Sequence, residues 1–275
     1  MSHSAAPDLK TFMNYDYPVD FTSDTAAAAV IRFVKPGSRV LEIGAGSGAI
    51  ARHLVEHNNC ELVALENNPT SVAKLRKFCS SVHNLDLNDD AWPRKLLAAA
   101  KLKGEAAKFD YVVAADVLEH LYDPWTVLKA MKTLLNSNGR VILSLPHASH
   151  SSVLTAFYNG DVQMNEWGLL DKTHIRFFGL RNIDGLYESA GMSVVNVHHV
   201  LRHPEETEFA EQFRALPIDV QNVFVRRGMS DIYQVVSEAM PSEKAQNPIV
   251  LENHLPKPDG SPSPRPNLFH RIFKW

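Results

Sequence analysis

The stretch that decides the fold is VLEIGAGSGA, residues 40–49, where three glycines at alternate positions follow a short apolar run. RVLEI, residues 39–43, is typical of a buried parallel strand, and AIARHLVEH, residues 49–57, has the spacing of a helix. A loop that leaves a strand and enters a helix presents free N–H groups, and glycine lets a ligand approach the backbone closely. The stretch therefore predicts a strand–loop–helix unit that binds a cofactor.

Outward from this unit, strand-like and helical segments alternate along the chain. Further strands are expected over residues 61–66, 82–86, 109–117, 139–146, 192–200 and 231–240. Helices are expected over 26–34, 69–80, 91–103, 123–136 and 180–191, and within 205–227. This order predicts an α/β protein with a doubly wound, mostly parallel sheet, whose ligands sit at the carboxyl ends of the strands.

The composition is that of an ordinary globular protein and excludes several classes. Of 275 residues, 45% are hydrophobic and the formal net charge is -3, so we expect no binding to nucleic acid. Cys60 and Cys79 form neither a disulfide framework nor a zinc spacing, which favours a reducing cytoplasm. We also expect no signal peptide and no transmembrane segment, because no apolar run approaches the roughly 18 residues that a span needs.

Acidic residues around the glycine loop bear on which cofactor binds there. Residues 44–48 read G-x-G-x-G, whereas the dinucleotide fingerprint is G-x-G-x-x-G, and this difference alone discriminates weakly. Glu42 lies inside the strand, where a buried carboxylate is costly unless a donor or a positively charged ligand compensates it. Glu66 ends the next strand and is placed to accept from ribose hydroxyls, and Asp86 is placed to accept from an adenine amino group.

Several of these segments together resemble a known family. RVLEIGAGSGAIARHL, LVALE, NLDLND and FDYVVAADVLEHLYDP, followed by LLNSNGRVILSLP, look like successive motifs of class I S-adenosylmethionine-dependent methyltransferases. The resemblance implies S-adenosylmethionine as cofactor and a seven-stranded, Rossmann-like sheet whose last strand is antiparallel. It places the glycine loop and Glu42 at the amino-acid end of the cofactor, Glu66 at the ribose, Asp86 at the adenine and Asp116 at the methionine end. The implied cofactor-binding residues are Glu42, Gly44, Ala45, Gly46, Gly48, Glu66, Asn67, Asp86, Leu87, Asp116 and Val117.

Narrower resemblances concern the methyl acceptor. LPHASH, GLLDKTHIRFFGLRNIDGLYESAG and DIYQVVSEAMP are similar to bacterial methyltransferases associated with sugar and glycan biosynthesis, although that family usually has Asn where this chain has His147. VLEHL and THIRFF resemble ubiquinone-type O-methyltransferases. The first resemblance implies O-methylation of a sugar, glycan or related small polar metabolite. A phenolic or quinone-like hydroxyl, or an amine, stays open as an alternative acceptor.

The long polar connection 147–179 is expected to hold the acceptor and the general base. The candidate catalytic residues are His174, His150 and Asp171, because Asp171 would orient His174 if the two shared a helical turn. The candidate substrate residues are His147, Tyr158 and Arg176. His147, His150 and Asp171 are an alternative metal set, but we expect no metal. Glu119 and His120 are expected to hold a helix start or to touch the cofactor.

The segments combine into one main domain with two appendages. We expect an N-terminal helical cover over 1–36, a methyltransferase domain over 37–240 with a substrate or lid insertion at 147–179, and an extended C-terminal tail over 241–275. A homo-oligomer stays open. Rivals from other classes are an NAD(P)-dependent oxidoreductase, which the glycine loop also allows, and a cofactor-binding regulator without turnover.

Overall fold

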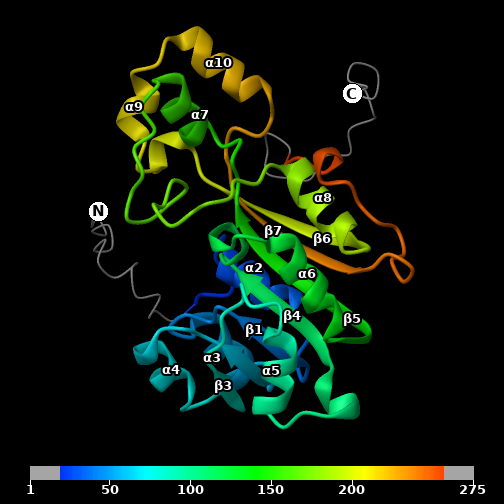
Figure 1. Ribbon diagram of the computed structural model, residues 1–275. Coiled ribbons are helices and arrows are strands. Elements are labelled where there is room, and N and C mark those ends of the chain that lie inside the picture. The colour runs from blue at the N-terminus through cyan, green and yellow to red at the C-terminus, as the bar shows by residue number, and fades with distance from the viewer. Residues whose placement is uncertain (1–18, 257–275) are drawn as a thin grey trace.

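A seven-stranded sheet runs through the part of the chain that is described in the computed structural model, residues 19–256 without the side chains of residues 105 and 106 (Figure 1). The strand order is β3-β2-β1-β4-β5-β7-β6, and only β7 is antiparallel to its neighbours β5 and β6. The strands are β1 (Arg39–Ile43), β2 (Glu61–Leu65), β3 (Ser81–His83), β4 (Phe109–Ala115), β5 (Leu135–Pro146), β6 (Met192–Leu201) and β7 (Ile232–Pro241). The predicted doubly wound sheet with an antiparallel last strand is confirmed.

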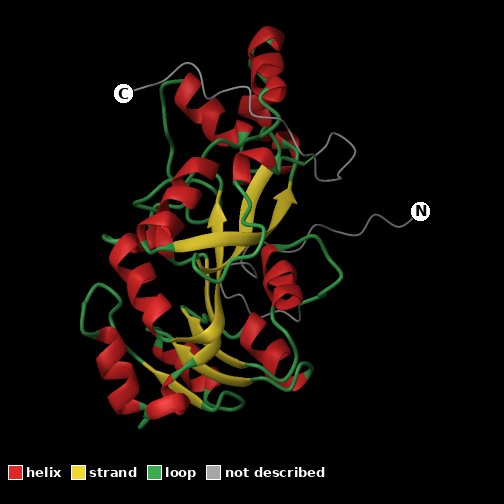
Figure 2. Ribbon diagram, turned by 90° about the vertical axis from the view of Figure 1, so that its right-hand side faces the viewer, coloured by secondary structure: helices red, strands yellow, loops and turns green. Residues whose placement is uncertain are grey.

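Helices cover both faces of the sheet (Figure 2). On one face pack α2 (Ala26–Phe33), α3 (Ala49–Glu56) and α4 (Pro69–Leu75). On the other pack α5 (Trp92–Ala99), α6 (Pro124–Thr133) and α8 (Leu180–Ser189). Strand residues alternate between these two cores: Val112 of β4 lies in one and Val113 in the other. Burial on both faces explains why β1, β2 and β4 read as continuous apolar runs in the sequence.

A helical cap lies beyond the carboxyl end of β5 and contains α7 (Ser151–Tyr158), α9 (Ala210–Arg214) and α10 (Ile218–Arg226) (Figure 1). We define the cap as residues 150–171 and 202–230, two excursions far apart in the sequence. Val153, Ala156, Leu169, Leu170 and Phe209 form its buried cluster. From the sequence, only residues 147–179 are expected in this layer. The second excursion is expected to be helical but is not placed there, because the pattern of a short amphipathic helix does not show which element it packs against.

Two other segments differ from expectation. β3 ends at His83, so Asp86 lies in the following turn, where its Oδ1 accepts a hydrogen bond of 2.9 Å from the Asn88 amide. Residues 242–256, expected as the start of an extended tail, instead pack against α8 and β6, with Leu251 and Leu255 buried in the core. The remaining tail, 257–275, and residues 1–18 of the N-terminal cover lie outside the described residues.

Short 3-10 turns complete the described chain: η1 (Gly104–Ala107), η2 (Leu118–His120), η3 (Pro204–Glu206) and η4 (Leu251–Asn253). None of the helices between residues 19 and 256 has the length and apolarity to cross a membrane.

Candidate functional site

The three glycines of the loop differ in what surrounds them. All have positive φ, at +68° for Gly44, +54° for Gly46 and +91° for Gly48. A Cβ at Gly44 would lie 2.6 Å from the Val117 side chain, and one at Gly48 would lie 2.7 Å from Phe78. A Cβ at Gly46 would meet no protein atom within 4 Å. Gly44 and Gly48 are therefore required by the packing of the loop, whereas Gly46 borders open space where a ligand can approach the backbone.

Two carboxylates flank this open position. Glu66, at the end of β2, accepts hydrogen bonds of 2.7 Å from the backbone amides of both Gly46 and Asn68. Glu42 in β1 is 3% exposed, and its Oε2 has no hydrogen-bond partner. Burial, together with the nearby Glu66, raises the pKa of Glu42 to about 8. A buried carboxylate oxygen without a partner, beside an open backbone, suits a ligand that carries a positively charged group.

The residues expected to bind the adenine are linked by hydrogen bonds to the segment that follows β4. Asp86 is exposed and accepts from both the backbone and the side-chain amide of Asn88, at 2.9 and 3.2 Å. Asn88 Oδ1 in turn accepts from the Tyr122 amide at 3.2 Å. Leu87 is half-buried against the core, and the Asn67 carbonyl accepts from the Asn84 side chain at 2.9 Å.

The last of the predicted cofactor-binding residues, Asp116 and Val117, lie at the carboxyl end of β4. Asp116 has φ of +54°, and its Oδ1 accepts hydrogen bonds from Ser144 at 2.9 Å and from Gln234 at 2.8 Å. Burial raises the pKa of Asp116. Val117 packs over Gly44, and Ala45 is buried with its amide donating to the Leu65 carbonyl at 3.1 Å. The predicted cofactor-binding residues thus lie along one edge of the sheet, at the ends of β1, β2 and β4 and in the turn after β3.

Next to Asp116, η2 contributes two polar side chains that meet His174. Glu119 is 1% exposed, and neither of its carboxylate oxygens has a hydrogen-bond partner. Burial, with Asp116 nearby, raises the pKa of Glu119 well above its ordinary value. His174 Nε2 lies 3.9 Å from Glu119 Oε1, and the rings of His120 and His174 lie 4.8 Å apart. We call Glu119, His120 and His174 the Glu119 cluster.

Backbone contacts hold the cluster together. The amides of Ile175 and Arg176 donate to the Glu119 carbonyl at 2.9 and 3.0 Å, which docks the segment carrying His174 onto η2. His174 Nδ1 donates to the Leu169 carbonyl at 3.3 Å, and burial lowers the pKa of His174. The imidazole is therefore neutral at pH 7, with the lone pair of Nε2 toward Glu119. Glu119 and His120 were expected only to hold a helix start or to touch the cofactor, although an acidic residue in the apolar run ADVLEHL is a usable signal of a site.

The other candidate bases lie elsewhere. His150 caps α7: its Nδ1 accepts from the Ser152 amide at 3.1 Å, and its Nε2 donates to the Arg202 carbonyl at 2.9 Å. Burial lowers the pKa of His150 to about 4. Both ring nitrogens are occupied, so the structure gives His150 a structural role in place of the expected catalytic one.

Asp171 does not orient His174, because residues 171–177 form turns and extended chain instead of the helix on which that expectation depended. Its carboxylate accepts from the Thr173 amide at 2.7 Å and from the Thr173 hydroxyl at 2.6 Å. His147 is buried with Nδ1 donating to the Ile232 carbonyl at 3.2 Å, and burial lowers its pKa to about 3. The alternative metal set of His147, His150 and Asp171 is not brought together.

The remaining substrate candidates lie apart. Arg176 donates to the Tyr122 carbonyl, and its guanidinium carbon lies 5.7 Å from the centre of the Trp125 ring. Arg176 is thus beside the Glu119 cluster. Tyr158 is 54% exposed at the end of α7 in the cap.

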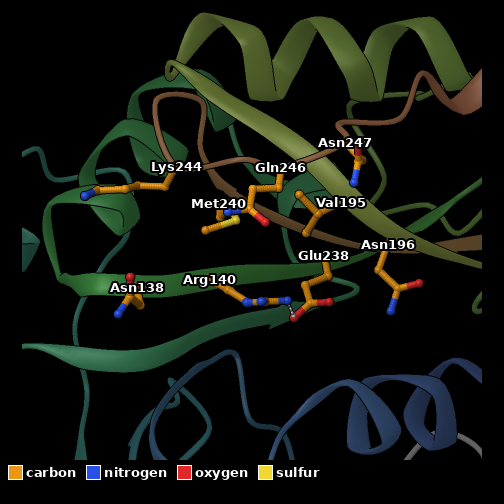
Figure 3. A pocket seen from close by; sticks show the side chains of 9 residues that line it. All are labelled: Asn138, Arg140, Val195, Asn196, Glu238, Met240, Lys244, Gln246 and Asn247. Atoms are coloured by element: carbon orange, nitrogen blue, oxygen red, sulfur yellow. Dashed lines mark hydrogen bonds and ion pairs between the residues drawn. The ribbon is translucent and has the colours of Figure 1, made fainter.

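A separate groove of about 580 Å³ lies beside β5, β6 and β7 (Figure 3). Arg140 of β5 and Glu238 of β7 point toward one another there and pair at 2.8 Å. None of the predicted site residues lines this groove, and its buried carboxylate already has a partner. The polar edge with unpartnered groups is therefore the better candidate site.

Comparison with known proteins agrees with this geometry. A family profile described as a methyltransferase domain matches residues 20–197. Ubiquinone biosynthesis O-methyltransferase of Paraburkholderia phymatum is 28% identical over 176 residues, which cover 63% of this chain and 72% of the relative. The protein of the same name from Ralstonia nicotianae is 23% identical over 175 residues, covering 63% and 71%. Neither name refers to a sugar.

Solved structures share the fold. A SAM-dependent methyltransferase from Archaeoglobus fulgidus aligns with a TM-score of 0.56 at 15% identity, covering 84% of this chain and 99% of that one. One from Mesorhizobium loti aligns with a TM-score of 0.51 at 13% identity, covering 78% and 97%. These matches favour a methyltransferase over the NAD(P)-dependent oxidoreductase that the glycine loop alone also allows. The chain belongs to the methyltransferase-domain family and is an S-adenosylmethionine-dependent enzyme with the class I fold.

Proposed function

We propose that this methyltransferase methylates an oxygen atom, the hydroxyl of a small molecule that binds at the Glu119 cluster. The observation that carries this proposal is the buried Glu119 carboxylate, which has no hydrogen-bond partner and faces His174 at 3.9 Å. A hydroxyl acceptor must lose its proton to become a good nucleophile, and a site with a neutral imidazole and a carboxylate suits that task. The names of the curated relatives support O-methylation.

The donor end is assigned to the glycine-loop edge. S-adenosylmethionine, when bound, supplies a methyl group on a positively charged sulfur. Glu42 would compensate the cofactor's ammonium group, because its Oε2 is buried without a partner, and Gly46 would lie against the amino-acid part. Glu66 and Asp86 would hold the ribose and the adenine, respectively. Asp116 belongs to this edge, and only two residues separate it from Glu119 in the sequence. This proximity supports a reacting centre between the cofactor edge and Glu119.

The chain's own residues mainly align the reactants and manage one proton. In-line attack of the acceptor oxygen on the methyl carbon would break the carbon–sulfur bond and release S-adenosylhomocysteine. His174 is the simplest group to receive the hydroxyl proton, on Nε2, since Nδ1 is held by the Leu169 carbonyl. Burial and Asp116 raise the pKa of Glu119, but an adjacent imidazolium would favour its ionised form, and the ionised carboxylate would in turn stabilise the imidazolium. The buried surroundings strengthen that interaction by excluding water.

A phenolic hydroxyl is the acceptor that the surroundings favour. Tyr122, Trp125 and Phe177 are 73%, 40% and 43% exposed, and Arg176 links the two segments that carry them. Exposed aromatic rings of this kind suit an aromatic ring better than a sugar. The sugar hydroxyl expected from the sequence is the second acceptor class to test.

The test is methyl transfer from labelled S-adenosylmethionine to three matched acceptor panels: dihydroxybenzoates and alkylated catechols, simple glycosides, and primary amines. Labelled methyl ether on the phenols is the expected product, and Glu119→Gln and His174→Ala should each lower its rate of formation about 10²- to 10⁴-fold. Labelling of amines alone, or undiminished labelling by both variants, would contradict the proposal.

A further inference from the structure

We propose that Glu119, His120 and His174 form a binding site for a divalent transition-metal cation such as Zn²⁺ or Mn²⁺. One potential ligand atom from each residue lies within 4.8 Å of the others. Between residues 19 and 256, no other group of three or more His, Cys, Asp and Glu side chains converges in this way. No metal was expected from the sequence, but the geometry of this cluster favours one.

The Glu119 carboxylate supplies the first argument. It is 1% exposed, and neither oxygen accepts a hydrogen bond from any described group. Burying such a polar group without a partner is costly, and buried charges in proteins are paired or coordinate metals. His174 Nε2 lies 3.9 Å from Glu119 Oε1, which is too far for a hydrogen bond, so this contact does not satisfy the carboxylate. A cation between the two groups would satisfy both.

The orientation of the two histidines supplies an independent argument. His174 donates its Nδ1–H to the Leu169 carbonyl at 3.3 Å, and His120 donates its Nδ1–H to the Thr173 carbonyl at 3.1 Å. Thr173 is itself held by Asp171 through two hydrogen bonds. Metal-binding histidines characteristically donate their second ring N–H to a backbone carbonyl, which fixes the ring and its tautomer. Here both rings are fixed in this manner.

The spacing and the donor set indicate which cation fits. Ligand atoms about 2.1 Å from one ion lie roughly 3–4 Å from each other. The 3.9 Å between His174 Nε2 and Glu119 Oε1 is already within that range, and the widest separation of 4.8 Å needs a contraction of about 1 Å. Two imidazoles favour a transition metal such as Zn²⁺ over Mg²⁺ or Ca²⁺, and the carboxylate is a ligand that also suits Mn²⁺. Three protein ligands leave a coordination position open.

This inference extends the proposed function, because an acceptor hydroxyl would take the open position. The cation lowers the pKa of a coordinated hydroxyl, whose proton then passes to water instead of to His174. The oxygen anion attacks the methyl carbon, the carbon–sulfur bond breaks, and its electron pair stays on the sulfur of S-adenosylhomocysteine. His174 then acts as a metal ligand and not as the general base.

The experiment is titration of EDTA-stripped full-length protein with MnCl₂ and, separately, ZnCl₂, followed by calorimetry and, for Mn²⁺, by the loss of the free-ion electron spin resonance signal. Wild type should bind one Mn²⁺ per chain. Glu119→Gln and His174→Ala should weaken this binding about 100-fold or more. His198→Ala is the matched control, because His198 lies outside the cluster, paired with Asp24 at 2.7 Å, and should leave Mn²⁺ affinity unchanged.

Wild-type protein that binds neither ion at millimolar concentration would overturn the proposal, and so would equal affinity in the cluster variants and wild type. Circular dichroism and S-adenosylhomocysteine binding confirm that each variant is folded. Metal binding without phenol methylation would leave the site intact and refute the proposed acceptor. Phenol methylation that survives stripping with EDTA, by a protein that binds no metal, would refute the site and leave the proposed function intact.

Discussion

The carboxylate of Glu66 accepts a hydrogen bond of 2.7 Å from the backbone amide of Gly46, so the end of β2 fixes the turn of the loop that follows β1. The same carboxylate holds the Asn68 amide at 2.7 Å, at the start of α4. One side chain thus fixes the loop on one side and the entry to the next helix on the other. The loop is shaped before a ligand arrives, which reduces the ordering cost of binding.

Gly46→Val should weaken S-adenosylhomocysteine binding by about 100-fold or more, because the branched side chain would fill the space that the ligand needs. The fold should survive, since no protein atom lies within 4 Å of the new Cβ, and the left-handed backbone costs only about 1–2 kcal/mol. Gly37→Val is the matched control. Gly37 also has a positive φ, +74°, and open space around it, but lies outside the site. Calorimetry that shows equal affinity for both variants would remove Gly46 from the cofactor site.

Glu42 should make cofactor binding depend on pH. Its pKa of about 8 means that it is mostly protonated at pH 7 in the free protein. The ammonium group of S-adenosylhomocysteine favours the ionised form of Glu42, so binding should release a proton. The affinity should therefore increase by up to about tenfold for each unit by which the pH rises toward 8. Calorimetry at pH 6.5 in buffers of different ionisation enthalpy measures the released proton. Glu42→Gln should release none, and a pH-independent affinity of wild type would show that Glu42 is ionised from the start.

Glu119→Gln and His174→Ala should each lower turnover about 10²- to 10⁴-fold while S-adenosylhomocysteine affinity stays near wild type. This split is expected because both side chains lie beyond the methionine end of the cofactor edge. Single-turnover rates and calorimetry on the same preparations separate the two quantities. Parallel losses of turnover and cofactor affinity would instead place the cluster in the cofactor site.

His150→Asn should change the pH dependence of stability and leave turnover at pH 8 close to wild type. Burial lowers the pKa of His150 from 6.5 to about 4, so the unfolded chain binds a proton more readily than the folded one. The wild type should therefore lose stability relative to the variant as pH falls from about 7 to about 4, by up to a few kcal/mol. Asparagine still caps α7. Urea unfolding at pH 8, 6 and 5 measures the difference, and parallel pH profiles would show that His150 is protonated in the fold.

How far the sequence predicts the site depends on where each residue sits. Glu42, Glu66 and Asp116 end or precede the end of buried strands, so strand periodicity alone places them on one edge. Glu119 and His174 are 55 positions apart, and their meeting depends on the docking of residues 173–176 onto η2, which no local pattern encodes. His150 illustrates the converse. Its position in a polar loop suggested catalysis, but burial and two backbone hydrogen bonds make it a helix cap.

The division of the cap between two excursions constrains how its sequence can change in evolution. Leu169 and Leu170 of the first excursion share one buried cluster with Phe209 of the second. Transplanting either excursion alone from a relative would expose the apolar partners left behind, whereas exchanging both together would preserve them. The cap is therefore a matched pair of segments, which can be exchanged together on an unchanged sheet.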